Sequence, residues 1–164
     1  MTRSKLFKAF SAATICSAIF LVPTIALSQS EPDKEDKAIL ARQGYMKLVV
    51  WEAGPLFGMA KGAMDYNADV AKARAANLKA LSQYPVENLF LPGTSNADRP
   101  GKTRSLPALW KDSAGVTKAY EQWRSAVDGV VDAAGKGQKE LAAAVGELGK
   151  SCGACHKPYR AKKS

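Results

Sequence analysis

The chain has 164 residues with a formal net charge of +9, and hydrophobic residues make up 46% of it. After removal of any leader, this length suits one domain. The basic residues are scattered and no aromatic residues interleave with a basic groove, which argues against a nucleic-acid-binding protein.

Residues 1–28 have the pattern of an export signal. Three basic residues open the segment, an uncharged apolar run follows from Phe10 to Ala26, and small residues for cleavage lie at its end. The apolar run is short for a transmembrane anchor, and Pro23 lies near its end. We expect cleavage at about 26–28, which lowers the net charge from +9 to +6 because those three basic residues are lost. Residues 29–164 would then work in the bacterial periplasm, with no membrane span.

Four helices are expected in the mature chain, from about Asp33 to Lys61, Asn67 to Tyr84, Pro107 to Ala134 and Gln138 to Ala161. In the third and fourth, apolar residues recur at alternating spacings of three and four, which is the seam of a helix bundle. Gly54-Pro55 should kink the first helix. The second ends near Pro85.

A long connection, 85–107, joins the second and third helices and carries three turn signals, so we expect it to cover something. The other two links are short, which makes the first and second helices, and the third and fourth, antiparallel neighbours. No sustained alternation of period two indicates a strand. The expected fold is all-α, an antiparallel four-helix bundle formed by residues 29–164 as a single domain.

The strongest chemical signal is Cys152-Gly153-Ala154-Cys155-His156, the attachment sequence for c-type haem. Two thiols about one helical turn apart can each add to a vinyl group of one macrocycle, and the adjacent histidine can bind the iron. The small residues Gly153 and Ala154 allow the backbone to approach the porphyrin. The sequence therefore predicts one covalently bound haem c.

Three other interpretations of this motif are a zinc site, a redox-active dithiol and a structural disulfide. A zinc site needs about four ligands, and the mature chain offers only Cys152, Cys155 and His156 as soft ligands. A thioredoxin-type dithiol expects a strand before the helix. A structural disulfide needs neither the histidine nor the apolar stripe, and it would make the chain an exported helical interaction protein.

His156 is the only histidine, so the sixth iron position must hold methionine, another weak donor or nothing. The mature chain contains Met46, Met59 and Met64. Because the first and fourth helices should be antiparallel neighbours, Met46 fits the level of the haem best, although methionine on an apolar face usually fills core space.

Four segments besides the haem motif resemble the cytochrome c-prime family across nearly the whole mature chain. They are Arg42-Gln43-Gly44-Tyr45-Met46, Phe90-Leu91-Pro92-Gly93-Thr94-Ser95, Leu109-Trp110 and Leu148-Gly149-Lys150-Ser151-Cys152, with Tyr159-Arg160 after the histidine. The resemblance implies that Arg42 and Gln43 lie by the haem edge and propionates and that Thr94 and Ser95 line the same pocket. It also places Arg160 near the proximal face of the haem.

The resemblance gives Met46 the distal position, where the family divides into two branches. In one branch a methionine binds the iron and the protein is a low-spin electron carrier. In the other the iron is five-coordinate and high-spin and binds nitric oxide or carbon monoxide. We expect the first: one-electron transfer with His156 and Met46 as axial ligands, gas binding being the alternative. A thioether is a good soft ligand for ferrous haem.

We expect no enzymatic activity, because the chain has no second histidine for acid–base catalysis and no clustered carboxylates at a plausible pocket. Its partners would be periplasmic redox proteins, of acidic surface if the basic tail 150–163 steers them, or small gases if the sixth site is open. Many members of the resembled family dimerise through the first two helices. Exposed Leu48 and Trp51 fit such a homodimer.

Overall fold

The computed structural model describes residues 31–163, so the predicted signal peptide, 1–28, lies outside the described residues. Its elements are α1 (Lys34–Ala60), α2 (Ala68–Ser82), the 3-10 helix η1 (Val86–Leu89), a short α3 (Ala108–Lys111), α4 (Ser113–Ala133) and α5 (Gln138–Tyr159). Strand-like pairing within this range is limited to one isolated bridge, between Ser105 and Arg160.

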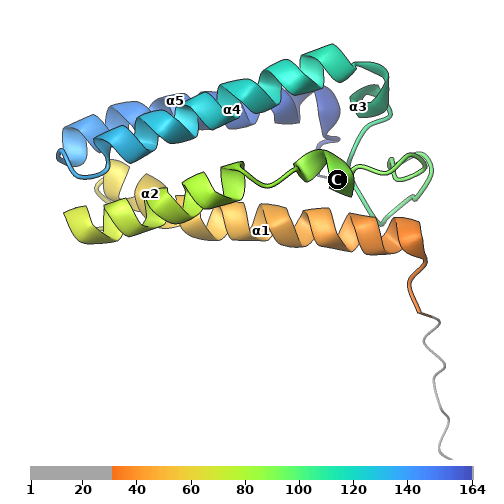
Figure 1. Ribbon diagram of the computed structural model, residues 1–164, viewed down its shortest axis with the longest axis horizontal. Coiled ribbons are helices and arrows are strands. Elements are labelled where there is room, and N and C mark those ends of the chain that lie inside the picture. The colour runs from red at the N-terminus through yellow and green to blue at the C-terminus, as the bar shows by residue number, and fades with distance from the viewer. Residues whose placement is uncertain (1–30, 164) are drawn as a thin grey trace, which may run out of the picture. The chain divides into compact units, whose positions relative to one another are not determined.

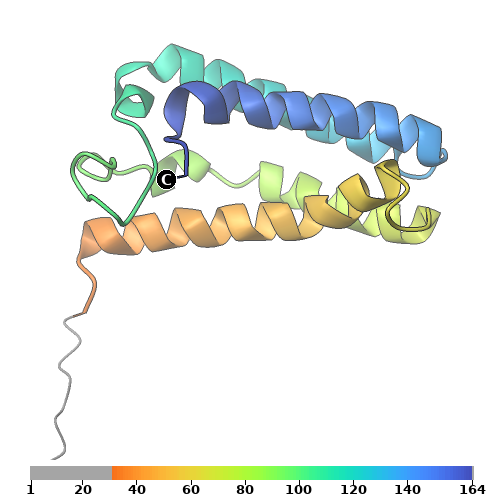
Figure 2. The same cartoon turned by 180° about the vertical axis from the view of Figure 1, so that it is seen from behind.

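The four long helices form the predicted bundle. α1 packs on α2 and α5, and α4 packs on α5 and α2, which closes the ring of contacts. Figures 1 and 2 show α1 and α5 running in opposite directions, so that α1 begins where α5 ends. The connection 83–112 crosses the bundle at this same end, which we call the loop end (Figure 1).

Side-chain caps mark the beginnings of α1 and α2. The carboxylate of Asp33 accepts from the Asp36 amide at 2.8 Å at the start of α1. Asn67 Oδ1 accepts from the amides of Asp69 and Val70 at 3.0 Å each at the start of α2. These bonds satisfy amides that have no partner within the first turn of a helix.

One detail of the predicted helices is wrong. The third predicted helix is split, because Asp112 has non-helical backbone angles (φ −121°, ψ 66°) and separates α3 from α4. Its side chain instead caps α4 by accepting from the Gly115 amide at 2.9 Å. α1 is a single helix that contains Pro55, as predicted, and the expected kink at Gly54-Pro55 stays a prediction.

The core lies along the axis of the bundle, and all four long helices contribute to it. Its fully buried members include Leu56, Leu78, Val127, Val130 and Leu141. Cys152 is half-buried and packs against this cluster. Between residues 31 and 163, none of the helices combines the length and the apolar character needed to cross a bilayer.

Candidate functional site

The last two turns of α5 carry Cys152, Cys155 and His156 at the loop end of the bundle. Both cysteines are half-buried free thiols, and their spacing of three positions along the helix places them about one helical turn apart. Burial raises the pKa of each thiol above its usual value. Both are therefore neutral thiols at neutral pH.

His156 is half-buried beside two arginines. Burial lowers its pKa, and the charges of Arg160 and Arg104 lower it further. The imidazole is therefore neutral at pH 7, the form that can bind a metal. The amide of Arg160 donates to the His156 carbonyl at 3.1 Å and caps α5. Arg160 thus lies close to the predicted proximal ligand.

The packing of α1 on α5 sets the level of Met46. A Cβ added to Gly149 would lie 3.5 Å from the Phe57 ring, so these two residues are opposite each other. Met46 lies eleven residues before Phe57, and Arg160 lies eleven residues after Gly149. Because the helices are antiparallel, these two equal shifts lead to the same level of the bundle. Met46 is therefore level with the end of α5, close to the turn that carries His156.

The flank of α1 that holds Met46 is apolar but remains open. Met46 is 38% exposed, and Val50, one turn later, is 69% exposed. In contrast, Met59 is 1% exposed in the core, and its sulfur accepts from the Asn67 amide at 3.5 Å. Met46 is thus a partly exposed methionine at the level of the cysteine motif.

These residues fit a haem of the c type. Two neutral thiols one helical turn apart suit two thioether bonds, the adjacent imidazole suits one axial iron position, and open apolar side chains on α1 suit contact with a macrocycle. A zinc site does not fit. In the part of the chain that the structure describes, no three His, Cys, Asp or Glu side chains are placed to share a metal ion.

Arg42 is a buried cation that holds the long loop onto α1. Its side chain is 3% exposed and donates to the Thr94 carbonyl at 2.6 Å, to Thr94 Oγ1 at 2.7 Å and to Thr103 Oγ1 at 2.8 Å. Its guanidinium lies over the rings of Phe90 (5.3 Å) and Trp110 (5.9 Å). Burial lowers its pKa. All its acceptors are neutral, and no carboxylate of the described residues pairs with it.

The other three residues predicted at the haem pocket also bond to this loop. Thr94 is buried, and its hydroxyl donates to the Leu91 carbonyl at 2.6 Å. The Ser95 hydroxyl donates to Asp98 at 2.6 Å. Gln43 is exposed and donates to the Lys102 carbonyl at 2.7 Å. Hydrogen bonds to the loop bring Arg42, Gln43 and Thr94 together, whereas the Ser95 side chain bonds to Asp98 within its own turn. Contact of each of these four residues with the haem stays a prediction.

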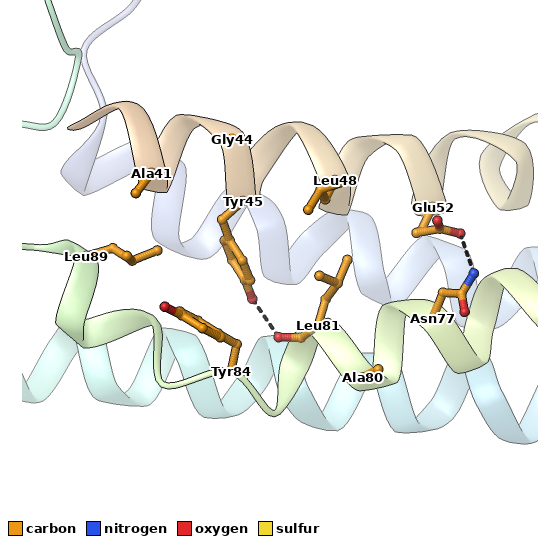
Figure 3. A pocket seen from close by; sticks show the side chains of 10 residues that line it. All are labelled: Ala41, Gly44, Tyr45, Leu48, Glu52, Asn77, Ala80, Leu81, Tyr84 and Leu89. Carbon is orange, nitrogen blue, oxygen red and sulfur yellow. Dashed lines mark hydrogen bonds between the residues drawn. The ribbon is translucent and has the colours of Figure 1, made fainter. Parts of the chain in front are cut away.

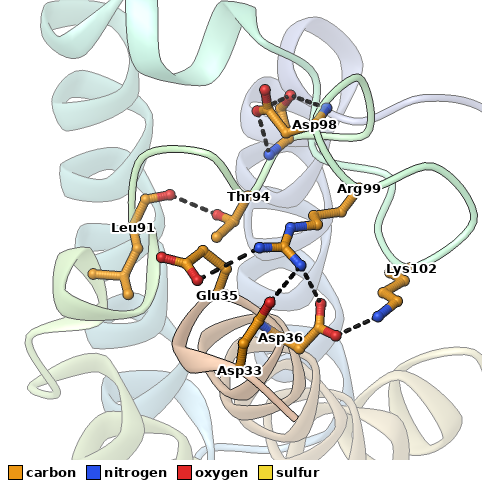
Figure 4. A network of polar contacts seen from close by, with 9 residues as sticks. Asp33, Glu35, Asp36, Leu91, Thr94, Asp98, Arg99 and Lys102 are labelled. Atoms are coloured by element: carbon orange, nitrogen blue, oxygen red, sulfur yellow. Dashed lines mark hydrogen bonds and ion pairs between the residues drawn. The ribbon is translucent and has the colours of Figure 1, made fainter.

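A charged network ties the same loop to the start of α1 (Figure 4). Arg99 donates to Asp33 at 2.8 Å and lies 3.4 Å from both Glu35 and Asp36. Lys102 pairs with Asp36. The hydrogen bond with Asp33 raises the pKa of Arg99. The loop is therefore fixed on α1 at two places, at its first turn and at Arg42.

Arg104 is a site residue that the sequence analysis missed. The Ala161 amide donates to the Arg104 carbonyl at 2.8 Å, and the Leu106 amide donates to the Tyr159 carbonyl at 2.9 Å. This pairing brings a loop arginine beside Arg160 and His156. No helical periodicity or short motif signals such a contact, since it joins segments more than fifty residues apart.

A groove of about 650 Å³ lies between α1 and α2, away from the cysteine motif (Figure 3). Its walls are mainly apolar, and it contains none of the predicted iron ligands. Tyr45 and Tyr84 lie at its centre with ring centroids 5.7 Å apart, and the Tyr45 hydroxyl donates to the Leu81 carbonyl at 2.9 Å. Leu48, on the rim, is 54% exposed.

Comparison with known proteins links the chain to haem proteins. The family model described as Cytochrome C' matches residues 37–160. A cytochrome c' of Cereibacter sphaeroides is 44% identical over 128 residues, which are 78% of this chain and 85% of that protein. A cytochrome c-554 of the same species is 34% identical over 142 residues, 87% of this chain and 92% of its own length.

Solved structures agree with the sequence comparison. A cytochrome c' from Rhodobacter sphaeroides superposes with a TM-score of 0.78 at 44% identity, covering 80% of this chain and all of that one. A ferrous variant of the Alcaligenes xylosoxidans protein with bound NO gives 0.69 at 30% identity over 81% and 100% of the two chains. A cytochrome c' with ligand-controlled dimer dissociation gives 0.72 at 25% identity, over 80% and 99%.

Proposed function

Because the chain belongs to the cytochrome c' family, we propose that it is a periplasmic one-electron carrier whose haem iron is bound by His156 and Met46. It is a monohaem c-type cytochrome and carries covalently attached haem c. We assign the two thioether bonds to Cys152 and Cys155. The proposal includes export by residues 1–28 and no enzymatic activity.

The observation that carries this proposal is the position of Met46. This partly exposed methionine is level with the end of α5, and Val50, one turn later on the same flank, is exposed as well. A thioether is a soft ligand that suits ferrous haem, and axial methionine with histidine is the ligand pair of cytochromes that transfer electrons.

The bound haem would supply an iron that is reduced and oxidised by one electron. The chain's own residues would set how readily that happens. The bundle core beside Cys152 keeps water from one side of the site, and burial favours the less charged iron state. Arg42 would bring a positive charge that lacks a carboxylate partner among residues 31–163, which suits a nearby haem propionate.

Substitution of each methionine tests the ligand assignment. Met46→Leu should convert the reduced protein from a low-spin to a high-spin spectrum and lower the reduction potential, because leucine cannot bind iron. Met59→Leu is the matched control, since Met59 fills the core at the other end of α1 and a swap of similar volume is tolerated there. If the two variants have the same low-spin spectrum as the wild type, Met46 is not the ligand.

A second function, binding of nitric oxide or carbon monoxide, is favoured by two observations. Variants of one related cytochrome c', from Alcaligenes xylosoxidans, have been solved with bound NO and with bound carbon monoxide. The Met46 side chain is partly exposed and has no polar contact that would hold it over the iron. In this reading Met46 would fill space beside an open sixth position.

The groove between α1 and α2 supports a homodimer as part of the same proposal. A dimer is described for one related cytochrome c'. In this chain the groove walls are apolar, Leu48 stands on the rim, and Trp51 beside it is 67% exposed. Large exposed apolar residues that gather around one groove mark an association surface.

A further inference from the structure

Five basic residues gather around the end of α5, and we call them the terminal basic surface. They are Arg104, Lys157, Arg160, Lys162 and Lys163. All five are exposed, and none forms an ion pair within residues 31–163. The end of α5 therefore carries five positive charges that no side-chain carboxylate of the described residues neutralises through an ion pair.

The fold holds these like charges together. The bridge between Ser105 and Arg160 and the hydrogen bond from the Ala161 amide to the Arg104 carbonyl fix the tail against the loop. Burial lowers the pKa of Arg160, and the nearby charge of Arg104 lowers it further. Like charges held this close repel each other, which is unfavourable unless an anion is near.

Two other cations of the connection 83–112 are paired with carboxylates. Arg99 pairs with Asp33, Glu35 and Asp36, and Lys102 pairs with Asp36. The dipole of α5 favours positive charge at its C-terminus and accounts for Lys157 and Arg160. It does not account for the remaining three, which lie outside the helix. These three require another explanation.

The surface also lies next to the predicted haem motif. Arg160 is close enough to affect the pKa of Cys152, Cys155 and His156, and Arg104 that of His156. Lys157 follows His156 directly in sequence. A protein that docks on the terminal basic surface would therefore come close to the haem.

We propose that the terminal basic surface docks an acidic patch of the protein with which this cytochrome exchanges electrons. The inference rests on the proposed electron transfer. Two haem propionates would neutralise at most two of the five charges. A cluster of one sign attracts the opposite sign over a distance and raises the association rate in a salt-dependent way.

The test compares two triple variants of the holoprotein. Arg104→Gln/Lys162→Gln/Lys163→Gln removes three charges from the surface and leaves the haem motif and Arg160 unchanged. Lys61→Gln/Lys136→Gln/Lys139→Gln is the control, with the same charge change at the opposite end of the bundle, where α1 ends and α5 begins. Stopped-flow spectroscopy measures electron transfer from reduced flavodoxin, an acidic protein, to the oxidised haem at several salt concentrations. The cationic oxidant tris(phenanthroline)cobalt(III) serves as the second probe, acting on the reduced protein.

We expect the surface triple to slow the reaction with flavodoxin about tenfold at low salt and to flatten its salt dependence. The control triple should change the rate less than about twofold, because its charges are distant from the docking surface. With the cationic oxidant the surface triple should react faster than the wild type. Equal effects of the two triples on flavodoxin would overturn the docking surface.

Two further results have separate meanings. If the wild type exchanges electrons slowly with both probes, the proposed electron transfer itself fails. If only the wild type sediments with phosphatidylglycerol vesicles while the flavodoxin rates are equal, the surface binds membranes and the acidic-partner proposal is wrong. A change of reduction potential in the surface triple, without a change in salt dependence, would assign these charges to the haem propionates and would also overturn it.

Discussion

Arg42 Nη2 donates to the backbone carbonyl of Thr94 at 2.6 Å, and this contact joins α1 to the loop that crosses the loop end of the bundle. The two residues are 52 positions apart in sequence. A buried charge with neutral acceptors is costly to leave unpaired, so the loop and the helix depend on each other.

Removal of the Arg42 charge should therefore destabilise the protein. Arg42→Met keeps an apolar stem but leaves the Thr94 carbonyl and the Thr103 hydroxyl without their donor. We expect the free energy of unfolding of the holoprotein to fall by about 2–4 kcal/mol in urea titrations. Lys47→Met, at an exposed position of the same helix, should change it by less than about 0.5 kcal/mol. An equal loss of unfolding free energy in both variants would contradict the proposed role of Arg42 in holding the loop on α1.

Two glycines of α4 should respond to alanine in opposite ways. At Gly115 a new Cβ would collide with the side chains of Asp112 and Tyr159, which are hydrogen-bonded to each other. At Gly129 it would meet no atom within 4 Å. Gly129→Ala should raise the free energy of unfolding by about 0.5–1 kcal/mol, because alanine loses less backbone freedom on folding than glycine does. Gly115→Ala should lower it. Thermal unfolding of the two variants measures both effects. Stabilisation by Gly115→Ala would contradict the close approach of Asp112 and Tyr159 to Gly115.

The hydrogen bond from Tyr159 to Asp112, 2.6 Å long, makes stability depend on pH. It raises the pKa of Tyr159 to about 12. A tyrosine pKa above its unfolded value near 10 stabilises the fold below pH 10, and that contribution is lost as the pH rises towards 12. The same bond lowers the pKa of Asp112, so the contribution of the carboxylate is present above pH 4 and lost in stronger acid.

Tyr159→Phe should remove both dependences. We expect the stability difference between wild type and variant, from urea unfolding at several pH values, to be constant between pH 5 and 9 and to shrink from pH 10 to 11.5. A difference that stays constant to pH 11.5 would mean that Tyr159 ionises as freely in the fold as in the unfolded chain.

A charge on the rim of the groove between α1 and α2 should dissociate the proposed dimer. Leu48→Glu would place a carboxylate where the two apolar surfaces meet, and sedimentation should show a monomer at concentrations where the wild type is dimeric. Val131→Glu changes an exposed apolar residue of α4, outside the groove, and should leave the dimer intact. A wild type that sediments as a monomer at high concentration would rule the dimer out.

The helices of this protein follow from local patterns. Asp33 and Asn67 are capping residues that indicate where α1 and α2 begin. The apolar pattern along α4 and α5 predicts which faces of these helices are buried. The break at Asp112 was not predicted, because its side chain can cap a helix only once the residues before it leave the helical conformation. Local rules allow either outcome at this position.

The candidate site likewise contains residues that local patterns predict and residues that they do not. The spacing of Cys152, Cys155 and His156 is a property of one helix and can be read directly. The roles of Arg42 and Arg104 depend on contacts with distant loop segments, at Thr94 and at Ala161. Such contacts arise from tertiary packing, which has no signature in a single sequence. The Ser95 hydroxyl bonds to Asp98 within its own turn, which the sequence does not indicate, and its place in the haem pocket stays a prediction.

The optical spectrum of the reduced holoprotein, before and after carbon monoxide is added, tests the central claim most directly. If His156 and Met46 both bind the iron, the spectrum has sharp low-spin bands and does not change with the gas. A broad high-spin spectrum that shifts when carbon monoxide is added would contradict this account. It would show that the sixth position is open and that gas binding is the function of the site.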